Sequence, residues 1–371
     1  MSPAWESADP TRPRRRCERQ LADDRPARCD HGRSGPPASP AGDPTSMPLP
    51  APLPWTAPSH RRRAVPTRSI AVTAGAMAVA VSAWTIAHRR SPAVSAWRPP
   101  TVSGERLGRV WCRTGGSGST GVVLLHGLVA TGDVFGSSID DLAERHVAAA
   151  PDLLGFGRSL DRQATDFGSD AHLSALDEAI DRACGDRPLL LGAHSMGSTL
   201  ALRWAARNPT RVGRIVCLGA PIWPSSHAAN EALGGMGPMA RALLIDGRLA
   251  QSLCELNCAH RNLSGCVAAT IAPRWPIPIA RQASLHTWEA YVQAVHQQIL
   301  HADWLPLLRR LDEARIPVEM VWGDQDPIGD VGYAKQLASE IPHLTVRRIG
   351  KADHTLPASR PRLLPSLLQA T

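Results

Sequence analysis

A serine flanked by small residues is the first candidate for chemistry in this chain. Residues 192–197 read Gly-Ala-His-Ser-Met-Gly, so Ser195 follows the apolar run Pro188–Leu191 and precedes a helix-like stretch, Ser198–Arg207. A tight strand-to-helix turn of this kind raises a serine hydroxyl above a sheet, where it can act as a nucleophile. The neighbours must be small because larger side chains would collide with the adjoining strand or helix. The alternative interpretation is that Ser195 is an ordinary helix N-cap.

A nucleophilic serine needs a base, and the base needs an acid. A serine hydroxyl barely ionises near neutral pH, so a histidine held by a buried carboxylate must take its proton. Asp326 lies in the loop after the predicted strand Val318–Trp322, and His354 lies in the loop after the last predicted strand. Catalytic residues gather where parallel strands end, and hydrolases with this turn use the chain order serine, acid, histidine. Ser195, Asp326 and His354 are therefore predicted to form a triad, with Asp324 as the alternative acid.

Two backbone amides complete the predicted site. The oxyanion of an acyl-transfer intermediate needs N–H donors close to the serine. The residue after the nucleophile, Met196, supplies one of them. The other is expected from the loop after an early strand, and the strand at 122–125 runs into His126-Gly127-Leu128. The Leu128 N–H is therefore the second candidate donor, and His126 is interpreted as a structural residue of this turn.

From about residue 106, short apolar runs alternate with helix-like stretches, which predicts an α/β fold with a mostly parallel sheet flanked by helices. The strand signal stops between residues 220 and 317, where prolines and helical periodicity indicate a helical cap at about 222–304. The predicted strands are Gly121–His126, Val147–Ala150, Leu189–His194, Ile215–Gly219, Val318–Trp322 and Leu344–Ile349, and the predicted helices lie near 136–145, 170–184, 196–208, 332–341 and 361–370.

Taken together, these features resemble the α/β-hydrolase superfamily, in its branch with a helical cap inserted after the sixth strand. The resemblance covers about residues 106–371. It implies serine-mediated hydrolysis through an acyl-enzyme, without a metal or an organic cofactor. The features that carry it are the His126-Gly127 turn, the segment Pro151–Ser159, the serine turn, the turn Gly323–Asp326 and His354.

Two positions depart from the family pattern. Ala193 stands where the serine turn usually has its first glycine, and Asp353 stands where a glycine often precedes the histidine. The serine itself argues against the epoxide hydrolases and haloalkane dehalogenases of the superfamily, which attack with an aspartate. We expect a carboxylesterase whose partner is a small-molecule apolar acyl ester. Perhydrolase chemistry, C–C bond or amide hydrolysis and a non-catalytic ligand-binding protein held at a membrane remain open alternatives.

Charge is unevenly distributed along the chain. Residues 1–100 carry 15 arginines against seven acids, whereas residues 101–371 carry equal numbers of basic and acidic side chains. The basicity therefore belongs to the N-terminal part, and the neutral remainder gives no electrostatic case for nucleic-acid binding. A neutral region that holds Trp223, Trp275, Trp288 and Trp304 suits an apolar ligand, although a core role for these tryptophans is the other interpretation.

The N-terminal hundred residues divide into three segments. Residues 1–68 are rich in proline and arginine and are expected to be a disordered tail, with Met47 as an alternative translation start. Residues 69–87 carry no charge and are long enough, at about 28 Å as a helix, to cross a bilayer core. They are interpreted as a membrane anchor, with an export signal or a helix packed on an exported or cytoplasmic protein as alternatives. Residues 88–105 are expected to be a linker.

The eight cysteines show no metal-binding pattern, because none of them forms a C-x-x-C pair. Cys254, Cys258 and Cys266 lie close together in the sequence. We expect free, mostly buried thiols, with a disulfide among these three as the alternative for an exported protein.

Overall fold

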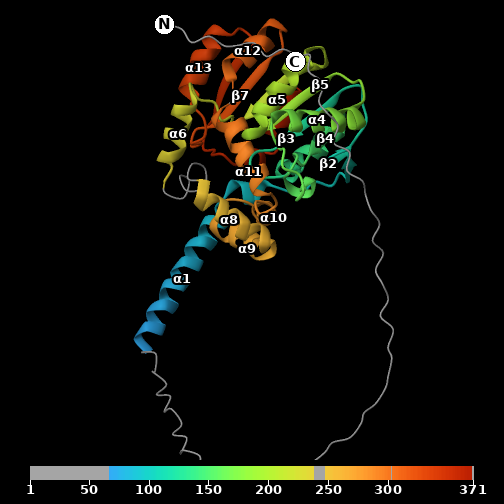
Figure 1. The fold of residues 1–371 in the computed structure, drawn as a ribbon. Helices are drawn as coiled ribbons and strands as arrows, with labels where there is room; N and C mark the ends of the chain where they lie inside the picture. Colours follow the sequence, from blue (N-terminus) through green and yellow to red (C-terminus); the bar gives the residue numbers. More distant parts are fainter. Residues whose placement is uncertain (1–66, 238–246, 302, 370–371) are drawn as a thin grey trace, which may run out of the picture. The chain divides into compact units, whose positions relative to one another are not determined.

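An eight-stranded sheet forms the centre of the protein in the computed structural model, which describes residues 67–237, 247–301 and 303–369 (Figure 1). The strand order is β1-β2-β4-β3-β5-β6-β7-β8. The pairings β1–β2 and β2–β4 are antiparallel, and all others are parallel. The strands are β1 (Gly104–Leu107), β2 (Val110–Gly115), β3 (Gly121–Leu125), β4 (Val147–Pro151), β5 (Leu189–His194), β6 (Val212–Leu218), β7 (Val318–Gly323) and β8 (Leu344–Ile349).

The predicted mostly parallel sheet is confirmed, and each of the six predicted strands is present. The central strands β3, β4 and β7 are buried along their whole length, and β3 and β4 appear in the sequence as continuous apolar runs. The sequence prediction missed β1 and β2, whose residues are partly exposed and include charged side chains. These two strands form an antiparallel edge and give no uninterrupted apolar signal.

Helices cover both faces of the sheet and create two cores. Side chains alternate along β3, so that Val123 and Leu125 join the core beneath α4 and α5, while Val122 and Leu124 join the core beneath α3 and α15. The predicted helices are confirmed to within a few residues. The flanking helices are α3 (Ser138–Ala143), α4 (Ser169–Cys184), α5 (Met196–Arg207), α12 (Trp304–Glu313), α13 (Val331–Glu340), α14 (Leu356–Ser359) and α15 (Leu363–Leu368), with short 3-10 turns at Gly132–Phe135, Gly157–Ser159 and Pro209–Arg211.

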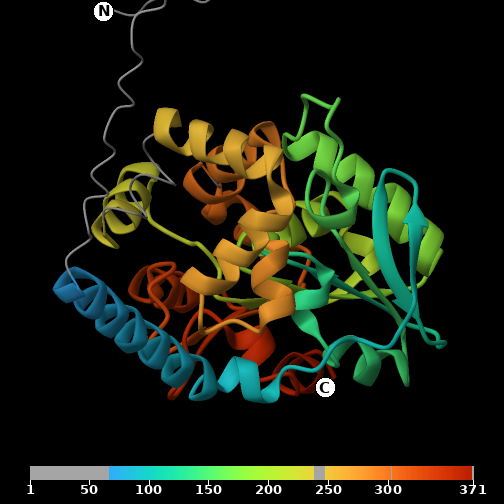
Figure 2. The same cartoon turned by 90° about the horizontal axis from the view of Figure 1, so that it is seen from below.

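The described residues between β6 and β7 are mostly helical, as predicted for a cap after the sixth strand. Figure 2 shows these helices, coloured yellow to orange, lying over one end of the sheet. They are α6 (Ser226–Gly235), α8 (Gly247–Ala259), α9 (Arg261–Ile271), α10 (Ile277–Gln282), α11 (Trp288–Ala294) and the π-helical turn Val295–Leu300.

Two helices precede the sheet, α1 (Thr67–Arg89) and α2 (Pro92–Ala96). The predicted tail at 1–68 lies outside the described residues except for its last two positions. Residues 88–105, expected as a linker, hold the end of α1, all of α2 and the start of β1. Within the part of the chain that the structure describes, no helix combines the length and the hydrophobicity needed to cross a membrane. The expectation that 69–87 spans a bilayer is thus not supported, although the segment is helical.

Candidate active site

The serine lies on a strained turn between β5 and α5. Ser195 has φ 52° and ψ −125°, a conformation that residues other than glycine avoid. Its N–H donates to the carbonyl oxygen of Leu218 on β6 at 2.8 Å, which holds the turn in place. A Cβ at Gly197 would collide with the carbonyl oxygen of Leu125, so glycine is required there. The methyl group of Ala193 is accommodated and fully buried, so this departure from the family pattern is compatible with the turn.

Asp326 and His354 are paired just beyond the ends of β7 and β8. The Nδ1 atom of His354 lies 3.0 Å from Oδ1 and 2.9 Å from Oδ2 of Asp326, and the ring N–H donates to the carboxylate. The carboxylate side chain is fully buried, and the histidine side chain is 25% exposed. The carboxylate therefore fixes the ring orientation and leaves Nε2 as the nitrogen that can exchange a proton.

Asp324, the alternative acid, has a different role. Its Oδ1 accepts a hydrogen bond from the N–H of Ala352 at 3.2 Å. Backbone hydrogen bonds from Lys351 and Ala352 lower the pKa of the Asp324 carboxyl group. The Asp324 carboxylate therefore stabilises the loop that leads to His354 through backbone contacts. The histidine itself is paired with Asp326.

The serine and the histidine approach each other around the end of β6. Leu218, which accepts the Ser195 N–H, is followed by Gly219. A Cβ on Gly219 would lie 2.8 Å from Oδ2 of Asp326 and 2.9 Å from Nδ1 of His354. Among the described residues, the Ser195 hydroxyl forms no hydrogen bond. Hydrogen bonds between catalytic groups often shorten only when substrate binds, so this arrangement fits a resting site.

His194 is a supporting residue that sequence reasoning missed, because only the folded chain brings it to His354. The two rings are 4.7 Å apart at 43°, and the Nε2 atom of His194 lies 3.0 Å from the carbonyl oxygen of His354. Burial holds the pKa of His194 well below its usual value, so the ring is neutral. A carbonyl oxygen can only accept, so Nε2–H donates and fixes the backbone that carries His354.

The two predicted oxyanion donors have no competing partner. Met196 is the first residue of α5, and Leu128 follows the end of β3. Within the described chain, neither backbone N–H donates to a protein acceptor. The first N–H groups of a helix lack an intrahelical acceptor and form the positive end of the helix dipole. Both amides are thus available for a developing negative charge.

His126 shapes the loop that carries the Leu128 amide. Burial lowers the pKa of His126 to about 4, so the ring is neutral near pH 7. Its Nδ1–H donates to the carbonyl oxygen of Gly127 at 2.8 Å, and its Nε2 accepts from the N–H of Leu153 at 2.7 Å. Both ring nitrogens are occupied, which agrees with the structural role expected for this residue.

A buried ion-pair network ties this loop to the cap. The carboxylate of Asp133 accepts from Arg113 at 2.5 Å and from Arg158 at 3.0 Å. Gln282, on α10 of the cap, donates to Asp133 at 2.9 Å and accepts from the hydroxyl of Thr131 at 2.5 Å. One glutamine thus connects the cap to the segment that follows Leu128. The sequence carried no signal for this contact, because its partners lie about 150 residues apart.

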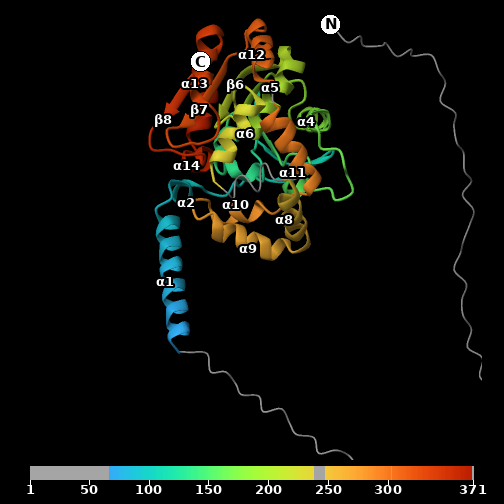
Figure 3. The ribbon, with the colours of Figure 1, turned by 60° about the vertical axis from the view of Figure 1, so that its left-hand side comes forward.

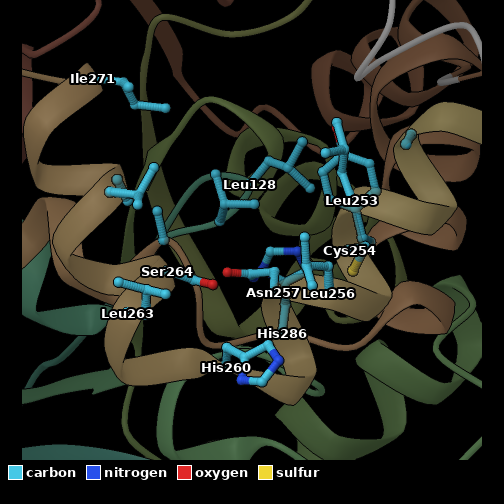
Figure 4. A pocket seen from close by; sticks show the side chains of 16 residues that line it. Leu128, Leu253, Cys254, Leu256, Asn257, His260, Leu263, Ser264, Ile271 and His286 are labelled. Atoms are coloured by element: carbon cyan, nitrogen blue, oxygen red, sulfur yellow. The ribbon is translucent and has the colours of Figure 1, made fainter. Parts of the chain in front are cut away.

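An apolar groove of about 620 Å³ reaches the Leu128 turn. Figure 4 shows Leu128 at its base, between side chains of α9 on one side and of α8 on the other. The lining is mainly aliphatic, with Leu253 and Leu256 from α8 and Leu263, Val267 and Ile271 from α9, and it also includes His260 and His286. Of the two interpretations of the cap tryptophans, the structure supports the core role for Trp223 and Trp304, which are buried in the hydrophobic core. Trp223 and Trp304 line a separate cavity of about 350 Å³.

The six cysteines among the described residues are free thiols, including Cys254, Cys258 and Cys266. In the same part of the chain, no three histidine, cysteine or carboxylate side chains are placed to hold a metal ion. Cys17 and Cys29 lie outside the described residues.

The family model of the alpha/beta hydrolase fold matches residues 121–361, a range that contains the serine turn, the acid and the histidine. The chain belongs to the alpha/beta hydrolase fold family. This confirms the family and the fold expected from the sequence motifs, and it places the protein in a superfamily of hydrolases.

Curated relatives and solved structures agree with this membership. An uncharacterised protein of Mycobacterium tuberculosis is 28% identical over 243 residues, which cover 62% of this chain and 68% of the relative. The lipase LipV of the same organism is 34% identical over 124 residues, which cover 33% of this chain and 46% of the lipase. The structure of E-2-(acetamidomethylene)succinate hydrolase is similar in fold, with a TM-score of 0.54 and 20% identity over 71% of this chain and 96% of that protein.

Proposed function

We propose that this protein is a serine hydrolase that cleaves an apolar acyl ester through Ser195, His354 and Asp326. The observation that carries the proposal is the bidentate contact of His354 with the buried Asp326 carboxylate, beside a serine held at φ 52°. A serine in this backbone conformation is strained, and strain of this kind persists where function requires it.

The proposed reaction begins with attack of the Ser195 Oγ atom on the ester carbonyl carbon. His354 Nε2 takes the hydroxyl proton as the Oγ–C bond forms, and the Asp326 carboxylate stabilises the resulting imidazolium through Nδ1–H. The negative charge moves to the carbonyl oxygen, where the N–H groups of Leu128 and Met196 stabilise it. Two unpartnered amides next to the strained serine support this assignment.

The acyl-enzyme then forms and is hydrolysed. The tetrahedral intermediate collapses, the C–O bond to the alcohol breaks, and His354 returns its proton to the departing alkoxide. In the second half, a water molecule attacks the acyl carbon while His354 takes one of its protons. The acyl C–Oγ bond then breaks and His354 returns the proton to Ser195 Oγ, which releases the carboxylic acid and regenerates the serine. His194 supports both halves because it holds the backbone of His354 in position.

The groove between α8 and α9 supports an apolar acyl substrate. It joins the turn that carries the Leu128 amide, and its walls are mainly aliphatic. An acyl chain bound there would place its carbonyl group near the oxyanion donors. The similarity to a protein named as a lipase agrees with this substrate class. Association with a membrane through the uncharged segment 69–87 is part of the same proposal.

Labelling with a fluorophosphonate tests the serine assignment directly. We expect the full-length protein to be labelled at one residue, and the Ser195→Ala variant to lose the label. Ser198→Ala is the matched control, because this buried serine lies on α5, about one helical turn beyond Ser195. A folded protein that remains unlabelled, or one that is labelled equally after Ser195→Ala, contradicts the proposal.

Paired amide substitutions test the acid. Asp326→Asn keeps the volume of the side chain but removes its charge, and we expect kcat for p-nitrophenyl butyrate to fall about 10³–10⁴-fold. Asp324→Asn is the control and is expected to change kcat by less than about threefold, since this carboxylate contacts the backbone rather than the histidine.

A further inference from the structure

Exposed apolar side chains are concentrated on one part of the molecule. Among the side chains that the structure describes, every exposed large apolar one lies on α1, on α8 to α10 or at the C-terminal end of α6. The helices that flank the sheet carry none. Soluble proteins rarely expose contiguous apolar surface of this extent unless it contacts a partner.

The cap contributes the first apolar surface. Leu249 and Leu256 on α8 and Leu263, Val267 and Ile271 on α9 have exposed fractions between 50% and 72%. Most of these side chains also border the groove that reaches Leu128. Figure 3 shows that α8 and α9 form the end of the catalytic body opposite to α12.

The N-terminal helix contributes the second surface, on the same side. Met77, Val79 and Val81 of α1 are 59–70% exposed. The C-terminal end of α1 is attached next to the cap, because His88 Nδ1 donates to the carbonyl oxygen of Pro273 at 2.9 Å and the hydroxyl of Ser91 donates to that of Arg274 at 2.5 Å. Figures 1 and 3 show α1 leaving the body beside the cap helices and extending beyond them.

Basic side chains collect where α1 meets the body. A cavity of about 550 Å³ is lined by Arg90, Arg274 and Lys351, by hydroxyl groups of neighbouring serines and a threonine, and by Ile86 of α1. Its one carboxylate, Asp353, forms an ion pair with Arg274 at 2.9 Å. In the described residues, no carboxylate forms an ion pair with Arg90 or Lys351, so the cavity carries uncompensated positive charge beside an apolar wall.

We propose that the face formed by α1, α8 and α9 docks on a bilayer that contains anionic phospholipid, with a headgroup phosphate bound between Arg90 and Lys351. A lipid fits better than a protein partner, because the exposed patch is aliphatic and lacks the tyrosine and tryptophan that protein interfaces favour. The positive charge at the base of α1 complements anionic headgroups. If the proposed esterase function holds, the groove opens toward the bilayer and receives acyl chains without their crossing water.

Sedimentation of the full-length protein with vesicles tests this surface. The vesicles contain phosphatidylcholine alone or phosphatidylcholine with phosphatidylglycerol. We expect the protein to bind both and to bind the anionic vesicles more strongly. The variant Leu256→Gln/Leu263→Gln/Ile271→Gln changes side chains that are 59%, 67% and 72% exposed, so it should fold, and its partition coefficient should fall at least about tenfold on both vesicles.

A charge variant separates the headgroup pocket from the apolar patch. Arg90→Gln/Lys351→Gln should reduce binding about tenfold on anionic vesicles and leave binding to phosphatidylcholine unchanged. The matched control is Arg309→Gln/Arg310→Gln, which removes two exposed charges from α12 at the opposite end (Figure 1). Circular dichroism and urea unfolding establish that each variant is folded.

The sedimentation results test docking on the bilayer and do not depend on catalytic activity. Absence of sedimentation with either vesicle, or variants that sediment like the wild type, would overturn the proposal. The second result would assign any binding to the arginine-rich residues 1–66 instead. The Ser195→Ala variant should sediment like the wild type, so failure of the proposed esterase function and failure of the docking surface give different results.

Discussion

Replacing Gly219 with alanine is expected to lower kcat about tenfold by displacing the Asp326–His354 pair. The added Cβ would lie 2.8 Å from Asp326 Oδ2 and 2.9 Å from His354 Nδ1. Ordinary contacts of a Cβ begin at 3.4 Å, so the carboxylate and the ring must move by about 0.5 Å. A displacement of about 1 Å at a catalytic group can reduce the rate about 10²-fold, and half of that displacement predicts about a tenfold loss.

The same substitution also affects stability, and the two effects can be separated. Gly219 has φ +58°, a conformation that costs about 1 kcal/mol for alanine, and overpacking adds about 1–3 kcal/mol. Gly213→Ala is the matched control within β6, the strand that Gly219 directly follows, because its added Cβ would find its nearest neighbour at 3.7 Å and its φ is not positive. Urea unfolding of both variants measures the loss of stability at temperatures where both remain folded.

Steady-state hydrolysis of p-nitrophenyl butyrate provides the decisive measurement. We expect kcat of the Gly219→Ala variant to fall, while KM stays within about twofold of the wild type because the groove at Leu128 is untouched. The Gly213→Ala variant should keep both constants. A folded Gly219→Ala protein with the kcat of the Gly213→Ala control would refute the role of the Asp326–His354 pair in catalysis.

Two further predictions concern stability. Burial lowers the pKa of His172 to about 3, and neither ring nitrogen has a partner among the described residues. This histidine binds a proton below about pH 6.5 in the unfolded chain but stays neutral in the folded chain. Lowering the pH from about 7.5 to about 5 should therefore reduce the free energy of unfolding by about 2 kcal/mol through this residue. His172→Leu should remove that part of the loss in urea titrations at the two pH values, and an unchanged loss would contradict the assignment. Gln282→Met should lower the free energy of unfolding by about 1–3 kcal/mol, since it leaves the buried Asp133 and Thr131 without their cap partner; a cap that is equally stable to urea would show that this contact is unimportant.

Much of the fold could be predicted from the sequence because the parallel strands are buried on both faces. In the central strands β3 and β4, burial on both faces produces an uninterrupted apolar run, and Gly121–Leu125 is an example. The candidate site was also accessible, since Ser195, Asp326 and His354 each follow the end of a predicted strand. The antiparallel edge strand Gly104–Leu107 has no such run, and its burial depends on packing that the sequence does not display.

The groove beside Leu128 could not be predicted for a different reason. Its walls are the exposed faces of α8 and α9, whose side chains meet Leu128 only after the cap has packed on the sheet. Apolar spacing along α8 fits an ordinary core-facing helix equally well. The tryptophans are the more conspicuous apolar residues in the sequence of the cap. Trp304, however, is buried and lines a different cavity from this groove. The candidate catalytic residues can thus be located from the ends of the strands in the sequence. The groove that would select a substrate depends on contacts between segments that are distant in the sequence.

Arg274 connects the surface proposed to face lipid with the loop that carries His354. Its carbonyl oxygen accepts from Ser91, and its guanidinium donates to Asp353, the residue directly before His354. Burial would raise the pKa of Asp353, but hydrogen bonds from Thr355 and the charge of Arg274 outweigh it and lower that pKa. Asp353 is therefore a carboxylate near neutral pH, which gives a physical reason for an acid where the family often has glycine. Arg274 thus joins the segment between α1 and α2 to the loop that carries His354.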